Sequence, residues 1–269
     1  MSYVPGSMEG LPEPAKQRLS EMRKRNFFTS DLSVNEFLLV REAGFDPVGL
    51  VMGSSIYHIG FQMGRVFQNM EMDVLTQAMY QARELAMTRM EEEADILGAD
   101  GIVGVRLEVT RYAWGAEMAE FMAIGTAIKS RDGANYKGND GRPFTSDLSG
   151  QDFWTLLQTG YRPLSLVMGT CVYHVAHQGL MQSLKQMGRN TEMANYTQAL
   201  YDARELAMSR MQAEAEREGA IGIVGTQVKE NSHGWDSHVI EYFSVGTAVV
   251  ESKVDHQPPS PQLTLSLCD

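Results

Sequence analysis

The stretch Tyr80–Val105, YQARELAMTRMEEEADILGADGIVGV, returns later in the chain as Tyr201–Thr226, YDARELAMSRMQAEAEREGAIGIVGT. Nine of the first eleven positions are identical between the two copies. Each copy has the pattern of a long helix, a glycine that ends it and a buried strand. The same unit is therefore written twice, and the rest of each half of the chain can be placed around it.

The helical part of each copy has an apolar stripe on one face. Its members recur three and four residues apart, which is the spacing of an amphipathic helix. In the first copy they are Leu75, Ala78, Met79, Ala82, Ala86, Met90, Ala94 and Leu97. Because half of them are alanine, we expect the helix to lie close to the surface that it covers. Gly98 and Gly219 fit the left-handed position that ends many helices, so we predict helices over residues 72–97 and 193–218.

Strands surround each predicted helix. Mostly apolar runs at residues 48–59 and 164–175 precede it, and they predict strands that are buried on both faces. After the helix, residues 105–110 alternate between apolar and polar side chains, whereas residues 121–128 and 242–250 are apolar on both faces. The period of the pattern changes from 3.6 to 2 at the glycines. This change predicts one long helix on a three-stranded antiparallel sheet, an α+β domain of β-α-β-β order, in each half.

A short helix is expected before the first strand of each repeat. Ser33 with Glu36, and Ser149 with Asp152, have the spacing of a capping box. We predict the following segments: a loose arm with one helical turn at 1–26, the first repeat at 27–130, a polar glycine-rich linker at 131–143, the second repeat at 144–253 and a disordered tail at 254–269. The second apolar face of each sheet needs a partner, either the sister repeat or another chain.

Composition excludes several classes of function. The chain of 269 residues has a formal net charge of −11, and an acidic protein repels phosphate backbones, so we expect no nucleic-acid partner. Two cysteines, Cys171 and Cys268, imply no disulfide framework. The N-terminus lacks the pattern of a signal peptide, and no apolar run approaches the roughly 18 residues of a membrane span. We therefore expect a cytoplasmic protein.

The ordered set of motifs in each repeat resembles the YbjQ family (UPF0145, DUF74), whose domain is labelled as heavy-metal-binding. The matching motifs lie at residues 82–86, 97–105 and 125–127 in the first copy, and at 203–207, 219–220, 223–225 and 246–248 in the second. The second copy departs from the pattern at Ile221, where the first has Asp100. The resemblance covers about 200 residues and implies dodecin-like domains, a helix on an antiparallel sheet. It also implies ring assembly, because single-domain members are similar in forming pentameric rings.

One group of residues has the composition of a metal site. Cys171, His174 and His177 form C-x-x-H-x-x-H, and a thiolate with two imidazoles suits zinc or copper. The first repeat has serine, histidine and phenylalanine at the same positions, so at most one copy could carry the site. In a strand, Cys171 and His177 point one way and His174 the other, and no fourth ligand is evident. A buried structural cysteine with histidines near a strand end is the favoured alternative, and we expect no cofactor.

Other residues are interpreted as contacts. The sequence predicts that subunits meet through Phe121, Ile124, Trp114, Tyr242, Val245, Trp235, Arg83 and Arg204. The tryptophans recur in the turn between the last two strands of each repeat and are typical anchors in subunit contacts. The arginines lie in the middle of the long helices, where a salt bridge across a helix-to-neighbour contact is the favoured interpretation. No acid-base or nucleophilic group accompanies them.

The sequence thus favours a non-catalytic cytoplasmic homo-oligomer that forms a ring, with five chains as the expected number. A heavy-metal-binding or metal-sensing protein is the alternative, with zinc or copper as its metal. A ring that holds small molecules between its subunits, as dodecin does, is the third possibility. No Ser-His-Asp order, phosphate-binding loop or paired C-x-x-C motif points to an enzyme.

Overall fold

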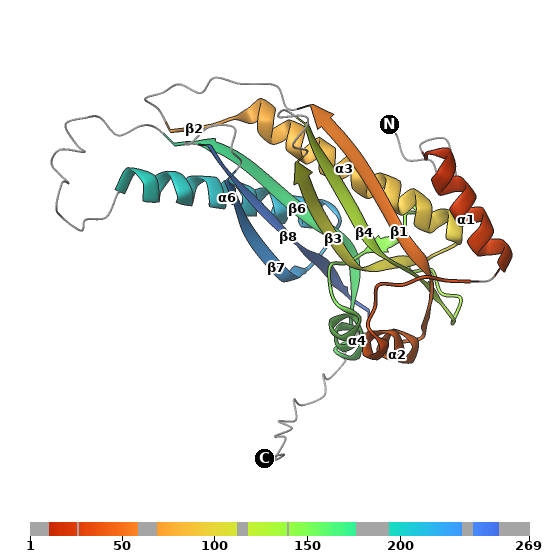
Figure 1. The fold of residues 1–269 in the computed structure, drawn as a ribbon. Helices are drawn as coiled ribbons and strands as arrows, with labels where there is room; N and C mark the ends of the chain where they lie inside the picture. Colours follow the sequence, from red (N-terminus) through yellow and green to blue (C-terminus); the bar gives the residue numbers. More distant parts are fainter. Residues whose placement is uncertain are drawn as a thin grey trace, which may run out of the picture.

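The computed structural model describes residues 11–25, 27–58, 69–111, 118–138, 140–175, 194–232 and 239–252. Within these residues the chain forms two repeats, each with a long helix on an antiparallel sheet (Figure 1). The predicted α+β class and its duplication are confirmed.

The first repeat contains α2 (Val34–Glu42), β1 (Phe45–His58), β2 (Met70–Glu71), α3 (Asp73–Leu97), β3 (Gly101–Arg111) and β4 (Met118–Ser130). The second contains β5 (Phe144–Thr145), α4 (Gly150–Gln158), β6 (Tyr161–His174), α6 (Ala194–Arg217), β7 (Gly222–Ser232) and β8 (Val239–Glu251). A further helix, α1 (Glu13–Arg25), precedes both repeats.

Each repeat completes the sheet of the other. Sheet A has the order β1-β4-β3-β5 and sheet B the order β2-β6-β8-β7. Strand β5 comes from the second repeat and pairs in parallel with β3 at Gly101 and Ile102. Strand β2 comes from the first repeat and pairs antiparallel with the end of β6. The predicted three antiparallel strands are therefore present in each sheet, and the exchange of two short strands ties the repeats together.

The helix ends lie where the sequence placed them. Gly98 follows α3 with φ 74°, and Gly219 follows α6 with φ 79°, the left-handed conformation that glycine adopts at little cost. Ser33 caps α2 in a complete capping box with Glu36. The two long helices begin and end within one residue of the predicted bounds.

Alanine and glycine allow each long helix to lie almost against its sheet. A Cβ atom on Gly53 would lie 2.1 Å from the carbonyl oxygen of Ala86, and one on Gly169 would lie 1.9 Å from that of Ala207. No side chain fits in either gap. Ser55 and Ser244 fill neighbouring positions on the same faces and donate hydrogen bonds to the carbonyls of Ala82 and Ala207.

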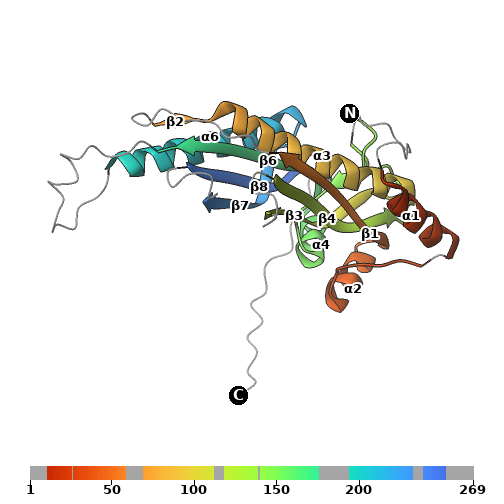
Figure 2. The ribbon, with the colours of Figure 1, turned by 45° about the horizontal axis from the view of Figure 1, so that its top comes forward.

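The N-terminal segment differs from its prediction. Residues 1–26 were expected to form a loose arm with one helical turn, yet Glu13–Arg25 form a regular helix. Leu19 and Met22 are buried, and Leu19 packs with Ile96 of α3. Figure 2 shows α1 beside the C-terminal end of α3, at the opposite end of that helix from β2. Tertiary contact rather than periodicity stabilises this helix, because its other residues are mostly charged.

The two first strands differ in burial although their sequences match. Both were predicted to be buried on two faces. Residues 166–174 of β6 satisfy this prediction, whereas β1 alternates between buried and half-buried positions and ends exposed. We call the face of each sheet that is turned away from its own long helix the outer face. The outer face of sheet B is buried, and that of sheet A is not.

The close approach of helix and sheet gives a first prediction. Replacing Gly169 by alanine should push α6 away from β6 and lower the free energy of unfolding by about 1–3 kcal/mol, as overpacked sites do. Asp46→Ala, which removes exposed ion pairs with Arg41 and Arg131 from β1, should change it by less than about 0.5 kcal/mol. Urea titration followed by circular dichroism measures both. Equal effects for the two variants would contradict the packing argument.

Candidate functional site: the contact between the repeats

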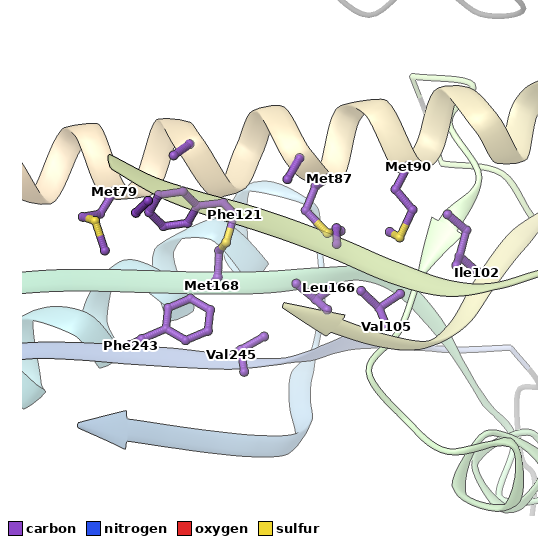
Figure 3. Close-up of a cluster of buried hydrophobic side chains, with 14 of the residues drawn as sticks. Met79, Met87, Met90, Ile102, Val105, Phe121, Leu166, Met168, Phe243 and Val245 are labelled. Carbon is purple, nitrogen blue, oxygen red and sulfur yellow. The ribbon is translucent and has the colours of Figure 1, made fainter. Parts of the chain in front are cut away.

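The largest buried cluster lies between the repeats rather than within either one. Helix α3 and the inner side of sheet A face the outer face of sheet B, so that side chains of both repeats interdigitate (Figure 3). The first repeat contributes Met79, Met87, Met90, Ile102, Val105 and Phe121, and the second Leu166, Met168, Val172, Phe243 and Val245. The sister repeat is therefore the partner that the second apolar face of sheet B required.

A buried ion pair lies in the middle of this contact. The guanidinium of Arg83 on α3 is 2.8 Å from Glu241 of β8 and donates a hydrogen bond of 2.8 Å to Thr170 of β6. Its carbon atom lies 4.0 Å from the ring centre of Phe243 and 5.5 Å from that of Phe121. Arg83 is 1% exposed and Glu241 0%. Such a pair tolerates the loss of neither partner, because an unpaired charge would remain in an apolar environment.

Further polar contacts join the repeats around the ion pair. Glu71 of β2 forms a two-pronged salt bridge with Arg210 of α6, at 2.6 and 2.9 Å. The hydroxyl of Tyr80 donates to Glu214 at 3.1 Å. The hydroxyl of Thr76 accepts the N–H of Val172 at 2.9 Å. These bonds fix α3 both along and across the strands of sheet B.

Acidic side chains meet between α3, α6 and the linker. A cavity of about 130 Å³ there is lined by Glu84, Glu91, Glu214, Asp140 and Arg142 together with apolar residues. Burial raises the pKa of Glu91 and of Glu214 to about 7, and the charge of Glu84 adds to both shifts. Arg142 lies 3.0 Å from Glu91 and opposes its shift. The contact between the repeats therefore contains carboxyl groups that ionise near neutral pH.

The residues predicted as subunit contacts fall into different environments. Phe121, Val245 and Arg83 are buried between the two repeats of the same chain. Tyr242 is 9% exposed and packs towards α6, with its hydroxyl on Glu230. Ile124 and Arg204 are half-buried. Trp114 and Trp235 lie outside the described residues. The salt bridge expected of Arg83 is present, although its partner is in the sister repeat.

The predicted metal ligands are not brought together within the described residues. Cys171 is buried against α6 with Ala199 and Ala203, and burial raises the pKa of its thiol to about 12. His174 is three residues further along a regular strand, so its side chain lies on the opposite face. His177 lies outside the described residues. In the part of the chain that the structure describes, no three His, Cys, Asp or Glu side chains converge as a metal site.

Sequence reasoning missed Glu241, Tyr80 and Glu214, which are central to the contact. A glutamate directly before an apolar run is ordinarily interpreted as solvated. The available signal was duplication: Glu120 and Glu241 occupy the same place in two otherwise apolar strands. A charged residue repeated within an apolar run marks a position with a buried partner.

The ion pair yields a second prediction. Arg83→Met should lower the free energy of unfolding by about 3–5 kcal/mol, because Glu241 would be left buried without its cation. The double variant Arg83→Met/Glu241→Gln should recover a large part of that loss, since it buries no charge. A double-mutant cycle measured by chemical denaturation gives the coupling between the two side chains. Additive effects would show that the pair does not hold the repeats together.

The raised carboxyl pKa gives a third prediction. An unfolded glutamate ionises near pH 4.5, whereas Glu214 in the folded chain stays protonated up to about pH 7. The folded state therefore holds a proton that the unfolded state releases, and stability falls as pH rises from about 4.5 to 7. Glu214→Gln should match the wild type at pH 4.5 and exceed it by roughly 3 kcal/mol at pH 8.

Thermal and urea unfolding across pH 4.5–8 test this expectation. Glu218→Gln is the matched control, because Glu218 follows α6 directly, lines the same cavity and is exposed. As a substitution at an exposed position, it should change the free energy of unfolding by less than about 0.5 kcal/mol. A Glu214→Gln profile parallel to that of the wild type would contradict the assignment.

Comparison with known proteins gives a consistent picture. The YbjQ family model, described as "Putative heavy-metal-binding", matches residues 46–131 and again 160–252. The chain is 53% identical over 241 residues to a protein named Encapsulin nanocompartment protein in Mycobacterium tuberculosis, covering 89% of this chain and 91% of that one. The relatives with the shorter matches correspond to one repeat. A UPF0145 protein of Clostridium perfringens is 40% identical over 89 residues, which are 31% of this chain and 82% of that protein.

A UPF0145 protein of Halorubrum lacusprofundi is 34% identical over 106 residues, which are 38% of this chain and 99% of that protein. One repeat therefore has the length of a whole UPF0145 protein, whereas the mycobacterial relative matches both repeats. Among the helices that the structure describes, none is long and apolar enough to cross a membrane.

Proposed function

Because the chain belongs to the YbjQ (UPF0145) family and carries two tandem copies of its domain, we propose that it is a non-catalytic structural protein. We propose further that it acts in the cytoplasm as a closed homo-oligomer, with five chains as the number that the family resemblance implies. The match to a nanocompartment protein along nearly the whole chain supports a role in an encapsulin nanocompartment.

The observation that carries this proposal is that the buried polar groups bond one structural element to another. Arg83 and Glu241 hold the two repeats together, and Ser55 and Ser244 hold helix to sheet. The hydroxyl of Thr247 accepts the backbone N–H of Asp147 and contacts Ser146, which anchors the segment before α4. These groups stabilise the fold. The ion pair of Arg83 with Glu241 is enclosed between the repeats and is not open to a substrate. Such an arrangement suits a building block better than a catalyst.

Native mass spectrometry and light scattering of the untagged protein at micromolar concentration test the assembly. We expect a mass several times the 29.9 kDa of one chain. Sedimentation together with encapsulin shells purified from the same host tests the compartment role. A homogeneous 29.9 kDa species would overturn the proposal, and an oligomer that never accompanies the shells would remove its compartment part.

The same sample tests the alternative of heavy-metal binding. We expect elemental analysis to find no stoichiometric zinc or copper, because Cys171 and His174 lie on opposite faces of β6. Cys171→Ser is the informative variant. Stoichiometric metal in the wild type that is lost in this variant would replace our proposal with metal binding.

A further inference from the structure

We propose that the contact between the two repeats is repeated between chains, so that the second repeat of one chain binds the first repeat of the next. This inference rests on the homo-oligomer proposed above and names the surfaces that build it. The occupant of each open surface is a second copy of this chain. The argument comes from the duplication: each component of the internal contact has an equivalent on the surface.

The outer face of sheet A is the first of these equivalents. It carries Leu50, Met52, Ile56, Met122 and Ile124, at the positions that Leu166, Met168, Val172, Phe243 and Val245 hold in sheet B. The sheet B residues are all buried by the first repeat. Ile56 is 57% exposed, whereas its equivalent Val172 is 0% exposed. Sheet A thus presents the apolar surface that sheet B covers with α3 and the inner side of sheet A.

Helix α6 presents the counterpart of the α3 surface. Arg204 is equivalent to Arg83, and Glu120 on the outer face of sheet A is equivalent to Glu241. In the single chain Arg204 contacts its neighbour Glu205 and is 39% exposed. Tyr201, the equivalent of Tyr80, is 51% exposed. A neighbouring chain would place Arg204 against Glu120 as Arg83 lies against Glu241.

The open edge of β7 is the second equivalent. In sheet A, the corresponding edge of β3 is covered by β5, and the ring of Phe144 lies 2.1 Å from where a Cβ on Gly101 would be. Gly222 is the equivalent of Gly101, and a Cβ there would meet no atom of the described residues within 4 Å. A groove of about 320 Å³ lies beside it, lined by Met208, Met211, Ala215, Ile221 and Ile223 among others. In the first repeat the equivalent residues Met87, Met90, Ala94 and Ile102 pack with Leu166 of the second repeat, so Leu50 of a neighbouring chain would fill this groove.

The segment that would pair with the edge of β7 is already positioned. Phe28 and Thr29 are equivalent to Phe144 and Thr145, and Phe28 is 43% exposed. Thr29 accepts the N–H of Leu50, as Thr145 accepts that of Leu166. Asp31 binds Thr126, as Asp147 binds Thr247. The segment therefore has the hydrogen bonds of β5 without its partner strand, and addition to the edge of β7 in the next chain supplies that partner.

These contacts are head-to-tail. Each chain offers α6 and the edge of β7 on one side, and the outer face of sheet A with Phe28 on the other. Such heterologous contacts form a ring when the rotation between subunits closes. The two repeats then alternate around a single ring, since the face of α3 that would bind another first repeat is occupied by the chain's own sheet B.

Charge reversal tests the pairing. Arg204→Glu places two carboxylates together at the contact, and Glu120→Arg places two guanidinium groups together, so each variant alone should shift from the wild-type oligomer to 29.9 kDa. The double variant should recover the wild-type mass. In a mixture of the two single variants each contact between unlike chains joins opposite charges, so the mixture should form species larger than 29.9 kDa even though a five-chain ring cannot close through such contacts alone. Lys16→Glu, which alters an exposed pair on α1, is the control and should keep the wild-type mass.

Gly222→Ala tests the strand contact independently. Its methyl group meets no described atom of its own chain but would collide with the ring of Phe28 from the neighbour, so we expect loss of the oligomer with unchanged circular dichroism. If Arg204→Glu, Glu120→Arg and Gly222→Ala all keep the mass of the wild-type oligomer, this inference is overturned. The proposal that the protein is an oligomer would still stand. Single variants that dissociate and do not bind one another on mixing would overturn the pairing of Arg204 with Glu120. A monomeric wild type would overturn the proposed function itself.

Discussion

A three-stranded sheet has two faces, and one helix can cover only one of them. In this chain the long helix of each repeat covers the inner face of its sheet and leaves the outer face uncovered. What packs against these two outer faces determines the arrangement of the repeats. The outer face of sheet B carries Leu166, Met168, Val172, Phe243 and Val245, all buried by the first repeat. At about 1.5–3 kcal/mol for each side chain, their burial is comparable to the whole stability of a typical domain. A second repeat folded alone would expose this face, so the two repeats are better regarded as one folding unit joined by a common core.

Apolar burial alone does not fix the position of one repeat on the other. On α3 the side chains that pack against sheet B include Met79, Met87 and Met90, and methionine is flexible enough to repack against a shifted partner. Arg83 supplies a fixed point, since its guanidinium reaches Glu241 and Thr170 only in one register. A buried ion pair adds little net stability compared with apolar side chains of the same size. Its effect here is selection of one arrangement, and the salt bridge of Glu71 with Arg210 reinforces the same register at the end of the contact.

Whether a helix, strand or contact could be predicted from the sequence depends on how strong its local sequence pattern is. Long helices and their terminal glycines have strong periodicity and local chemistry, and they were predicted to within a residue. Strands β2 and β5 contain two residues each, too few to show any period, so the exchange between sheets was unforeseen. Helix α1 was missed because only Leu19 and Met22 are buried in a charged segment. The candidate contact was half predicted: Arg83 was placed in a salt bridge, whereas its partner Glu241 could be identified only once β8 was placed against α3.

Some positions differ between the two copies and others are identical, and the identical positions indicate which surfaces of the second repeat make contacts. On the inner face of the sheet, Val105 and Val109 of the first repeat are replaced by Thr226 and Glu230 in the second, where the strand is exposed. Relaxation of that kind is expected for a surface strand. Tyr201, Arg204 and Gly222 have nevertheless kept the identities of Tyr80, Arg83 and Gly101. Glycine within a strand is destabilising by roughly 0.5–1 kcal/mol relative to alanine, and among the residues that the structure describes no side chain lies against Gly222 to require it. A glycine that weakens its own strand, with no described side chain against it, is best explained by a contact that the single chain does not contain.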